Sequence, residues 1–194
     1  EGVAQGVLPK KQLPRGLSHG QMVEAFVLLS ALGGESVEDM ERLRADRGLA
    51  TLLGYTPPAA ETARQWLNRF HDEDALDGRP EQGSFLPPET AGLVGLGAVS
   101  QRVVVAYVGA VRPAVEVTLD VDAHLVETSK VDAKVCYDGY PAYQPMEVVW
   151  GETGLVLADE FREGNVPASK DIRRLVDSAH GALPPGAWKV RVRS

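Results

Sequence analysis

Cysteine is nearly absent from this sequence, with Cys136 alone among 194 residues. A single thiol excludes an internal disulfide framework and the usual cysteine-based zinc sites, and it fits a reducing cytoplasm. Gly, Arg or Asp interrupts the longest apolar stretches, so we expect none to span a bilayer, and no signal-peptide pattern begins the chain. Basic residues are also scarce, with 20 Lys and Arg against 27 Asp and Glu and a net charge of −7. This deficit weighs against DNA binding unless basic residues gather locally.

Helical patterns fill the first third of the chain. Residues 1–17 are interrupted by Gly and Pro and are expected to form an arm. Residues 18–21 read Ser-His-Gly-Gln, a capping box that begins an apolar helical pattern. Two short helices are expected over 36–54, each with apolar residues on one face. Proline is tolerated before a helix but not inside it, so the break at 56–58 predicts a fourth helix over 60–71.

The helix expected over 60–71 carries polar residue types that can contact DNA. Arginine, glutamine and asparagine side chains on one helix face can reach guanine, adenine or phosphate. The tight turn before this helix is typical of a helix-turn-helix. The alternative is an amphipathic helix whose outer face is merely solvated. The candidate DNA-binding residues are Thr62, Arg64, Gln65, Asn68 and Arg69.

In the C-terminal half the hydrophobic period changes from 3.6 to 2. Alternation over 115–121 predicts a strand, and two more are expected within 135–150 and over 155–161. A helix capped by Ser169 should follow, and then a strand over 188–193. Three antiparallel strands, a helix and a fourth strand parallel to the first is the order in which an RNase H-like fold begins. Many other α+β domains begin in the same way.

Two acidic residues on the first expected strand are candidate metal ligands. Asp120 and Asp122 are two residues apart, so their side chains project from the same face of the strand. Carboxylates are the preferred ligands of Mg²⁺ or Mn²⁺ in phosphoryl-transfer sites. The alternative is a solvated strand face, since paired surface acids are common. His124 follows closely and is expected to be a surface residue, whereas Cys136 is expected in the core of a strand.

Several segments, in order and spacing, resemble the group-1 DDE transposases of bacterial insertion sequences. The resemblance covers nearly the whole chain from Leu17. The segments that carry it are Leu17–Met22, Gly33–Glu35, Leu52–Tyr55, Thr62–Asp72, Thr118–Ala123, Tyr137–Tyr140, Tyr143–Pro145 and Arg162–Val166.

The resemblance implies an enzyme that cuts the DNA ends of a mobile element and joins them to target DNA. Such enzymes hold two Mg²⁺ (or Mn²⁺) ions with an Asp, a second Asp and a Glu. Asp122 followed by Ala123 best fits the first Asp of that set, with Asp120 as its neighbour and possible substitute. His124 departs from the family, which usually has Thr there. The second Asp would directly follow Ser194, so we expect a truncated chain that does not cleave DNA alone.

Taken together, the sequence predicts an α+β protein with a helix-turn-helix segment followed by the first half of an RNase H-like domain. The expected parts are an arm (1–17), a helical DNA-binding segment (18–78), a linker and helix (79–113) and a partial catalytic domain (114–194). The expected partners are element-end and target DNA and a second copy of the chain, with no membrane contact. The expected location is the bacterial cytoplasm, at the nucleoid.

Two other functions remain open. The first is a non-catalytic DNA-binding regulator that competes with a full transposase for DNA ends. The second is an acidic α+β scaffold that has no role on DNA. The apolar segment over 94–111 suits either a dimer interface or a buried core helix.

Overall fold

The structure is a computed structural model that describes residues 16–71, 74, 77–112, 115–186 and 188–194. Within these residues the protein is mixed α+β, with six α-helices and a mixed sheet of four strands. Contacts divide the chain into two compact units, Glu1–Ala75 with Glu89–Ala98 and Leu76–Pro88 with Val99–Ser194. All but the last two residues of the expected arm lie outside the described residues. The boundaries expected at 78 and 113 stay predictions.

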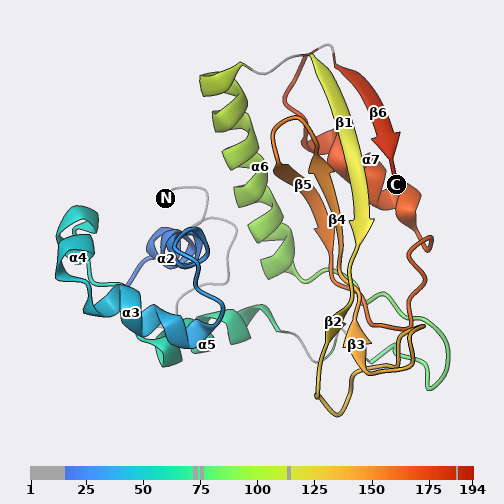
Figure 1. The fold of residues 1–194 in the computed structure, drawn as a ribbon, viewed down its shortest axis with the longest axis horizontal. Helices are drawn as coiled ribbons and strands as arrows, with labels where there is room; N and C mark the ends of the chain where they lie inside the picture. The colour runs from blue at the N-terminus through green and yellow to red at the C-terminus, as the bar shows by residue number, and fades with distance from the viewer. Residues whose placement is uncertain (1–15, 72–73, 75–76, 113–114, 187) are drawn as a thin grey trace. The chain divides into compact units, whose positions relative to one another are not determined.

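The first unit is helical, as its sequence pattern predicts (Figure 1). Its α-helices are α2 (His19–Ala31), α3 (Met40–Ala45), α4 (Arg47–Leu53) and α5 (Ala60–Leu67), and two 3₁₀ turns, η1 (Val37–Asp39) and η2 (Asn68–Phe70), adjoin α3 and α5. The helix expected over 60–71 is therefore shorter than predicted, because its last residues form the 3₁₀ turn η2. The helix expected from Ser36 likewise begins as a 3₁₀ turn.

Local capping explains where these helices begin and end. The capping box at α2 is confirmed, since Gln21 N donates to Ser18 Oγ at 3.2 Å and Ser18 N donates to Gln21 Oε1 at 2.7 Å. Each bond satisfies a backbone donor that a helix start leaves without an intrahelical partner. Gly54 ends α4 in the left-handed region, at φ 72°, where glycine avoids the Cβ clash.

Trp66 of α5 lies at the centre of the aromatic core of this unit. It is 5 % exposed, and its ring centroid lies 5.6 Å from that of Phe26 and 4.8 Å from that of Phe70. Its indole Nε1 donates to Nδ1 of the buried His19 at 2.9 Å, which satisfies the indole donor. The buried face of α5 is thus fixed by aromatic packing, and the opposite face is left in solvent.

Helix α6 (Ala91–Val111) is apolar but mostly exposed. Val104 is buried, whereas Val94 and Val103 are more than half exposed. One 18-residue window has a mean hydropathy of 1.5, so α6 is long and apolar enough to cross a membrane. We expected every apolar stretch to be interrupted too early to span a bilayer. The length and composition of α6 contradict this expectation. One such helix is weak evidence for a membrane span, and the absence of membrane contact stays a prediction.

The second unit contains the four-stranded sheet, in the order β5-β4-β1-β6 (Figure 1). Its strands are β1 (Glu116–Ala123), β4 (Met146–Trp150), β5 (Leu155–Glu160) and β6 (Lys189–Arg193). Strand β4 is antiparallel to both β1 and β5, and β6 lies parallel beside β1. The predicted succession of three antiparallel strands, a helix and a fourth strand parallel to the first is confirmed.

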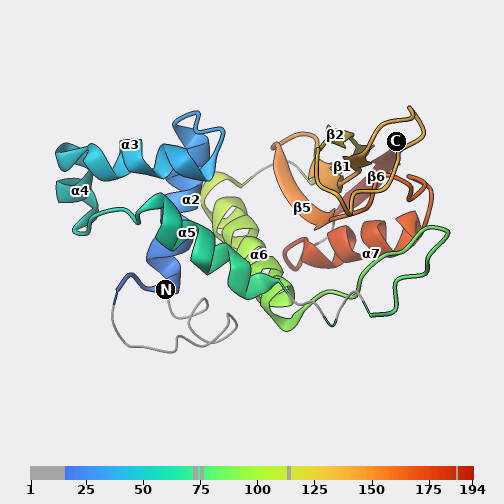
Figure 2. The same cartoon turned by 90° about the horizontal axis from the view of Figure 1, so that it is seen from below.

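Helix α7 (Ile172–Ala182) makes the crossover between β5 and β6 and lies against the sheet (Figure 2). Its buried Leu175 and Ala179 pack with Val117, Leu119 and other core residues of the strands. The expected cap at Ser169 is wrong, because the N-cap is Asp171 and its side chain makes no capping bond.

Two features of this unit are absent from the sequence prediction. Strands β2 (Val126–Glu127) and β3 (Ala142–Tyr143) form a small antiparallel sheet of their own. Cys136 is buried as expected, but it lies in the turn-rich segment between them, outside any strand. Two-residue strands are too short to produce a detectable alternation.

Candidate functional site

The polar face of β1 carries both predicted metal ligands. Buried Val117, Leu119 and Val121 alternate with half-buried Asp120 and exposed Asp122, so the two acids share the face opposite the core. Burial of the valine and leucine face fixes the strand register, because a one-residue slip would place the acids in the core. The structure therefore places Asp120 and Asp122 on one face.

The carboxylate of Asp120 is paired with an arginine of the neighbouring strand. Arg193 is its register partner on β6. The Nε and Nη2 atoms of Arg193 donate to the two carboxylate oxygens, both at 2.7 Å. Hydrogen bonding to Asp120 and the charge of that carboxylate raise the pKa of Arg193. A bidentate pair uses both oxygens of Asp120, so a metal ion would have to displace the guanidinium.

Asp122 is the freer of the two acids. Its Oδ1 accepts a hydrogen bond from the backbone N of Ala123 at 2.9 Å, and its side chain is exposed near the end of β1. Its register partner on β4 is Glu147. Within the described part of the chain, no group of three or more His, Cys, Asp or Glu side chains could hold a metal ion. Mg²⁺ requires several fixed oxygen ligands, so the acids present do not form a complete site.

The five candidate DNA-binding residues are all exposed. Thr62, Arg64 and Gln65 lie on α5, and Asn68 and Arg69 lie on the 3₁₀ turn that follows it. All five lie away from the side formed by the buried Ala63, Trp66 and Phe70. The structure thus gathers them on the solvent side of one short segment.

Three of these exposed residues differ in how free they are to bind DNA. Arg64 forms ion pairs with Glu61, at 2.9 Å, and with Glu38. Gln65 donates to Glu61 at 2.9 Å. The hydrogen bonds from Gln65 and Arg64 lower the pKa of Glu61, so that carboxylate stays ionised beside them. Arg69 has no ion pair among the described residues, so it is more available to a phosphate than Arg64.

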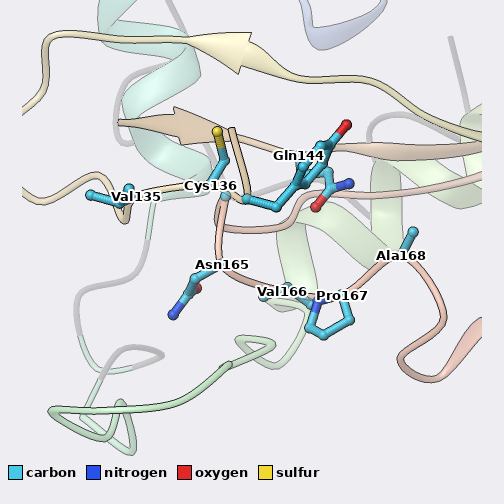
Figure 3. Close-up of a pocket in the computed structure, with 9 residues that line it drawn as sticks. Val135, Cys136, Gln144, Asn165, Val166, Pro167 and Ala168 are labelled. Atoms are coloured by element: carbon cyan, nitrogen blue, oxygen red, sulfur yellow. The ribbon is translucent and has the colours of Figure 1, made fainter. Parts of the chain in front are cut away.

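A pocket that sequence reasoning did not identify lies in the second unit (Figure 3). It has a volume of about 500 Å³. Its lining comes from three segments far apart in sequence: Val135, Cys136 and Tyr137, then Gln144, then Gly164, Asn165, Val166, Pro167 and Ala168. These positions overlap three of the segments that carry the transposase resemblance. That overlap was the one signal in the sequence, but no role could be assigned without the fold.

Gly164 brings the two walls of this pocket together. Its backbone N donates to Ala142 O at 2.9 Å, and Ala142 N donates to Lys134 O at 3.1 Å. A Cβ atom at position 164 would lie 2.5 Å from Ala142 O and 2.9 Å from Lys134 O. Only glycine fits so close to two backbone carbonyls, so this residue sets the spacing of the walls.

Buried Arg162 holds the loop 164–168, which forms one wall of the pocket. Arg162 is fully buried, and its Nη1 donates to Pro167 O and Ala168 O, each at 3.2 Å. Its Nε donates to Glu160 at 2.6 Å, and Glu160 also pairs with Arg174 of α7. Burial lowers the pKa of Arg162. The ion pair to Glu160 offsets the desolvation of the guanidinium.

The segment before α6 is tied to the same loop by polar contacts. Arg79 forms an ion pair with Glu163 at 2.7 Å, and both side chains are largely buried. Asn165 Nδ2 donates to Gly83 O at 2.8 Å, and Lys170 Nζ donates to Ser84 O at 2.9 Å. The loop 162–170 is therefore fixed from both sides, by Arg162 within it and by residues 79–84 against it.

Comparison with known proteins gives no further identification: no family model, no curated protein and no solved structure matches the chain.

Proposed function

We propose that this chain has the function of a DNA transposase, with a DNA-binding segment followed by part of a metal-dependent, RNase H-like catalytic domain. The observation that carries the proposal is the parallel register between β1 and β6, in which Asp120 lies opposite Arg193. This pairing brings the carboxyl ends of β1 and β6 side by side, and Asp122 lies near the carboxyl end of β1. The resemblance expects metal-binding acids at the carboxyl ends of these two strands. Two carboxylates side by side on neighbouring strands could share metal ions.

The strand topology also supports an RNase H-like domain. The sheet order β5-β4-β1-β6, with α7 as the crossover to β6, has the connectivity expected for the start of that fold. In such a fold the carboxyl ends of β1 and β6 are neighbours, and Asp122 lies near the carboxyl end of β1. Among the described acids, Asp122 is the better candidate for first metal ligand because Asp120 is held by Arg193.

DNA recognition is assigned to α5 and the turn after it, with α4 and α5 as a helix-turn-helix. The aromatic core around Trp66 holds this segment, and five polar side chains are exposed on its outer side. Arg69 is the strongest candidate for a phosphate or base contact, because Arg64 would first have to leave Glu38 and Glu61. The proposal carries with it a homodimer that bridges two DNA ends in the bacterial nucleoid.

The test is selection of duplex DNA from a randomised pool, followed by fluorescence anisotropy with the enriched duplex. Arg69→Ala should weaken binding by roughly 1–3 kcal/mol, the value of one good contact, and Arg64→Ala should weaken it less. Arg173→Ala is the matched control, since this arginine is highly exposed on α7 in the other unit. No enriched duplex at low salt, or equal losses for Arg69→Ala and Arg173→Ala, would contradict the assignment.

A second candidate function is a non-catalytic DNA-binding regulator. The favouring observations are that Arg193 holds both carboxylate oxygens of Asp120 and that no three His, Cys, Asp or Glu side chains among the described residues could hold a metal ion together. Both candidates require DNA binding and differ only in strand cleavage. Nicking that the wild-type chain shows and Asp122→Asn lacks would exclude the regulator, whereas the absence of nicking is expected for both candidates.

A further inference from the structure

Residues 77–88, which we call the strap, lie on the second unit without contributing to its core. The strap contains no helix or strand, and none of its residues is fully buried. It belongs to the same compact unit as the sheet and the loop 162–170. A segment with few buried apolar contacts can open locally, because little apolar surface is lost to water when it leaves. The strap must therefore be held by its polar contacts.

Three anchors join the strap to the loop 162–170. The anchored pairs are Arg79 with Glu163, Gly83 with Asn165, and Ser84 with Lys170. The ion pair of Arg79 and Glu163 is largely buried, with side chains 20 % and 10 % exposed. The cost of taking two charges out of water offsets much of their attraction, so such a pair adds little net stability to the closed strap. Both partners would regain water if the strap opened.

Three polar atoms at these anchors are buried without a hydrogen-bond partner among the described residues. They are Nε of Arg79, Oε2 of Glu163 and Oδ1 of Asn165. A buried polar atom that makes no hydrogen bond costs free energy, because it has lost water and gained no other partner. When the strap leaves, all three atoms can bond to water. Opening thus recovers free energy that the closed arrangement gives up.

We propose that the strap opens from the loop 162–170 as a separate unit while the four-stranded sheet stays folded. In the closed state the strap covers Glu163, which is 7 % exposed, and binds the side chain of Asn165, which lines the pocket. Figure 3 shows this side chain pointing away from Gln144. No charged residue lines the pocket in the closed state. Opening exposes the Glu163 carboxylate beside Gly164 and so adds an acid at the edge of the pocket.

The first experiment measures how cleavage of the strap in the full chain depends on urea. Glutamyl endopeptidase cuts after Glu81, which is exposed and lies between the anchors at Arg79 and Gly83. Local opening exposes little new surface, so the rate of this cleavage should depend far less on urea than global unfolding measured by circular dichroism. Equal urea dependence, or no cleavage after Glu81 in the folded chain, would overturn the proposal.

Glu163→Gln tests the strongest anchor. In this variant Arg79 stays buried without its ion-pair partner only while the strap is closed, so cleavage after Glu81 should become at least about tenfold faster. Glu127→Gln is the matched control, because Glu127 is exposed on β2 and has no ion pair among the described residues. An unchanged rate in Glu163→Gln, or an equal rise in Glu127→Gln, would overturn the proposal.

A second variant keeps the test decisive if Glu163→Gln does not fold. Lys170→Met keeps an unbranched side chain and removes the ammonium that donates to Ser84. Cleavage after Glu81 should rise severalfold while the circular dichroism spectrum stays unchanged. Lys189→Met is the control, since Lys189 is exposed on β6 and has no ion pair in the described part of the chain. Equal rates in folded Lys170→Met and the wild type would overturn the proposal. No DNA is used, so the outcome is independent of the proposed function.

Discussion

Gly164 lies at a close approach of two backbones in the second unit. A methyl group there would meet Ala142 O and Lys134 O at 2.5 and 2.9 Å, and backbone atoms cannot move aside as a flexible side chain can. We expect Gly164→Ala to lower the free energy of unfolding by roughly 1–3 kcal/mol, the range for overpacked positions. Urea denaturation followed by circular dichroism measures the change.

The matched control for this substitution is Gly181→Ala. Gly181 lies in α7, and a Cβ there would have no neighbour within 4 Å. Because alanine favours helix more than glycine, Gly181→Ala should be neutral or stabilising by up to about 1 kcal/mol. Equal losses in the two variants would show that the close approach at Gly164 is not what matters.

Glu160 is the shared acid of a largely buried charge cluster. It pairs with fully buried Arg162 and with Arg174, and its own side chain is 11 % exposed. Glu160→Gln removes the carboxylate that pairs directly with buried Arg162 and leaves Asp171 as its remaining counter-charge, so we expect a loss of up to about 3–5 kcal/mol in unfolding free energy. Thermal and urea unfolding measure it.

An exposed ion pair on α7 provides the comparison for Glu160. Arg173 and Asp177 are 3.8 Å apart and both side chains are mostly in solvent. Asp177→Asn should therefore change stability by less than about 1 kcal/mol. If Glu160→Gln lowered the unfolding free energy no more than Asp177→Asn does, the charge cluster would not be what stabilises the loop after β5.

At the scale of elements, the alternation of apolar and polar residues located a strand correctly, whereas the spacing of apolar residues gave inexact bounds for the helices. The alternating residues 115–121 predicted β1, because burial of one face imposes a period of 2. The helix expected over 60–71 was too long, because periodicity does not distinguish a last α-turn from a 3₁₀ turn. The cap expected at Ser169 was wrong because Asp171 precedes the first helical residue in a left-handed conformation. The spacing of apolar residues does not reveal a left-handed residue before a helix.

Strand β1 is joined to the β4–β5 turn by a carboxylate whose ionisation the fold favours. Thr118 Oγ1 donates to Glu152 Oε1 at 2.6 Å and Thr118 N donates to Glu152 Oε2 at 2.8 Å. The Thr118 hydroxyl bond, followed by the backbone bond, lowers the pKa of Glu152 below its ordinary 4.5. A depressed carboxyl pKa contributes stability that is present above the unfolded pKa and lost as pH falls through the folded value.

Thr118→Val should therefore raise the pKa of Glu152 toward 4.5 and reduce the loss of stability below that pH. Valine keeps the shape of threonine and removes only the hydroxyl donor, while the backbone bond remains. NMR titration of the Glu152 carboxyl measures the pKa, and urea denaturation across the acid range measures stability. In a Glu152→Gln background the same substitution should leave the acid limb unchanged. A change there would assign the effect to another group.

At the scale of the whole molecule, the candidate sites differ in how far sequence could predict them. Asp120 and Asp122 could be placed on one face because they lie on one strand. The bidentate pair between Asp120 and Arg193 could not be predicted, because it depends on the register of two strands 73 residues apart. The pocket was missed for the same reason, since Cys136, Gln144 and Gly164 meet only through the loop that Arg162 holds.

The acids that the structure describes on β1 lead to a prediction for the purified protein. With Asp120 held by Arg193, Asp122 offers Mg²⁺ too few fixed oxygens for tight binding. We expect no magnesium-dependent nicking of supercoiled plasmid by the purified chain. Asp122→Asn is the control that distinguishes a contaminating nuclease, whose activity would persist in it. Nicking that the wild-type chain shows and Asp122→Asn lacks would contradict the expectation.

Strand β6 lies at the edge of the sheet among the described residues, and this position has a consequence for the behaviour of the chain in solution. An uncovered strand edge is a template on which another chain can add a strand. Lys189, Arg191 and Arg193 occupy alternate positions of β6, and Arg191 and Arg193 pair with Glu116 and Asp120 of β1. Lys189 has no ion pair among the described residues, and an exposed lysine on an edge strand disfavours the addition of another strand there.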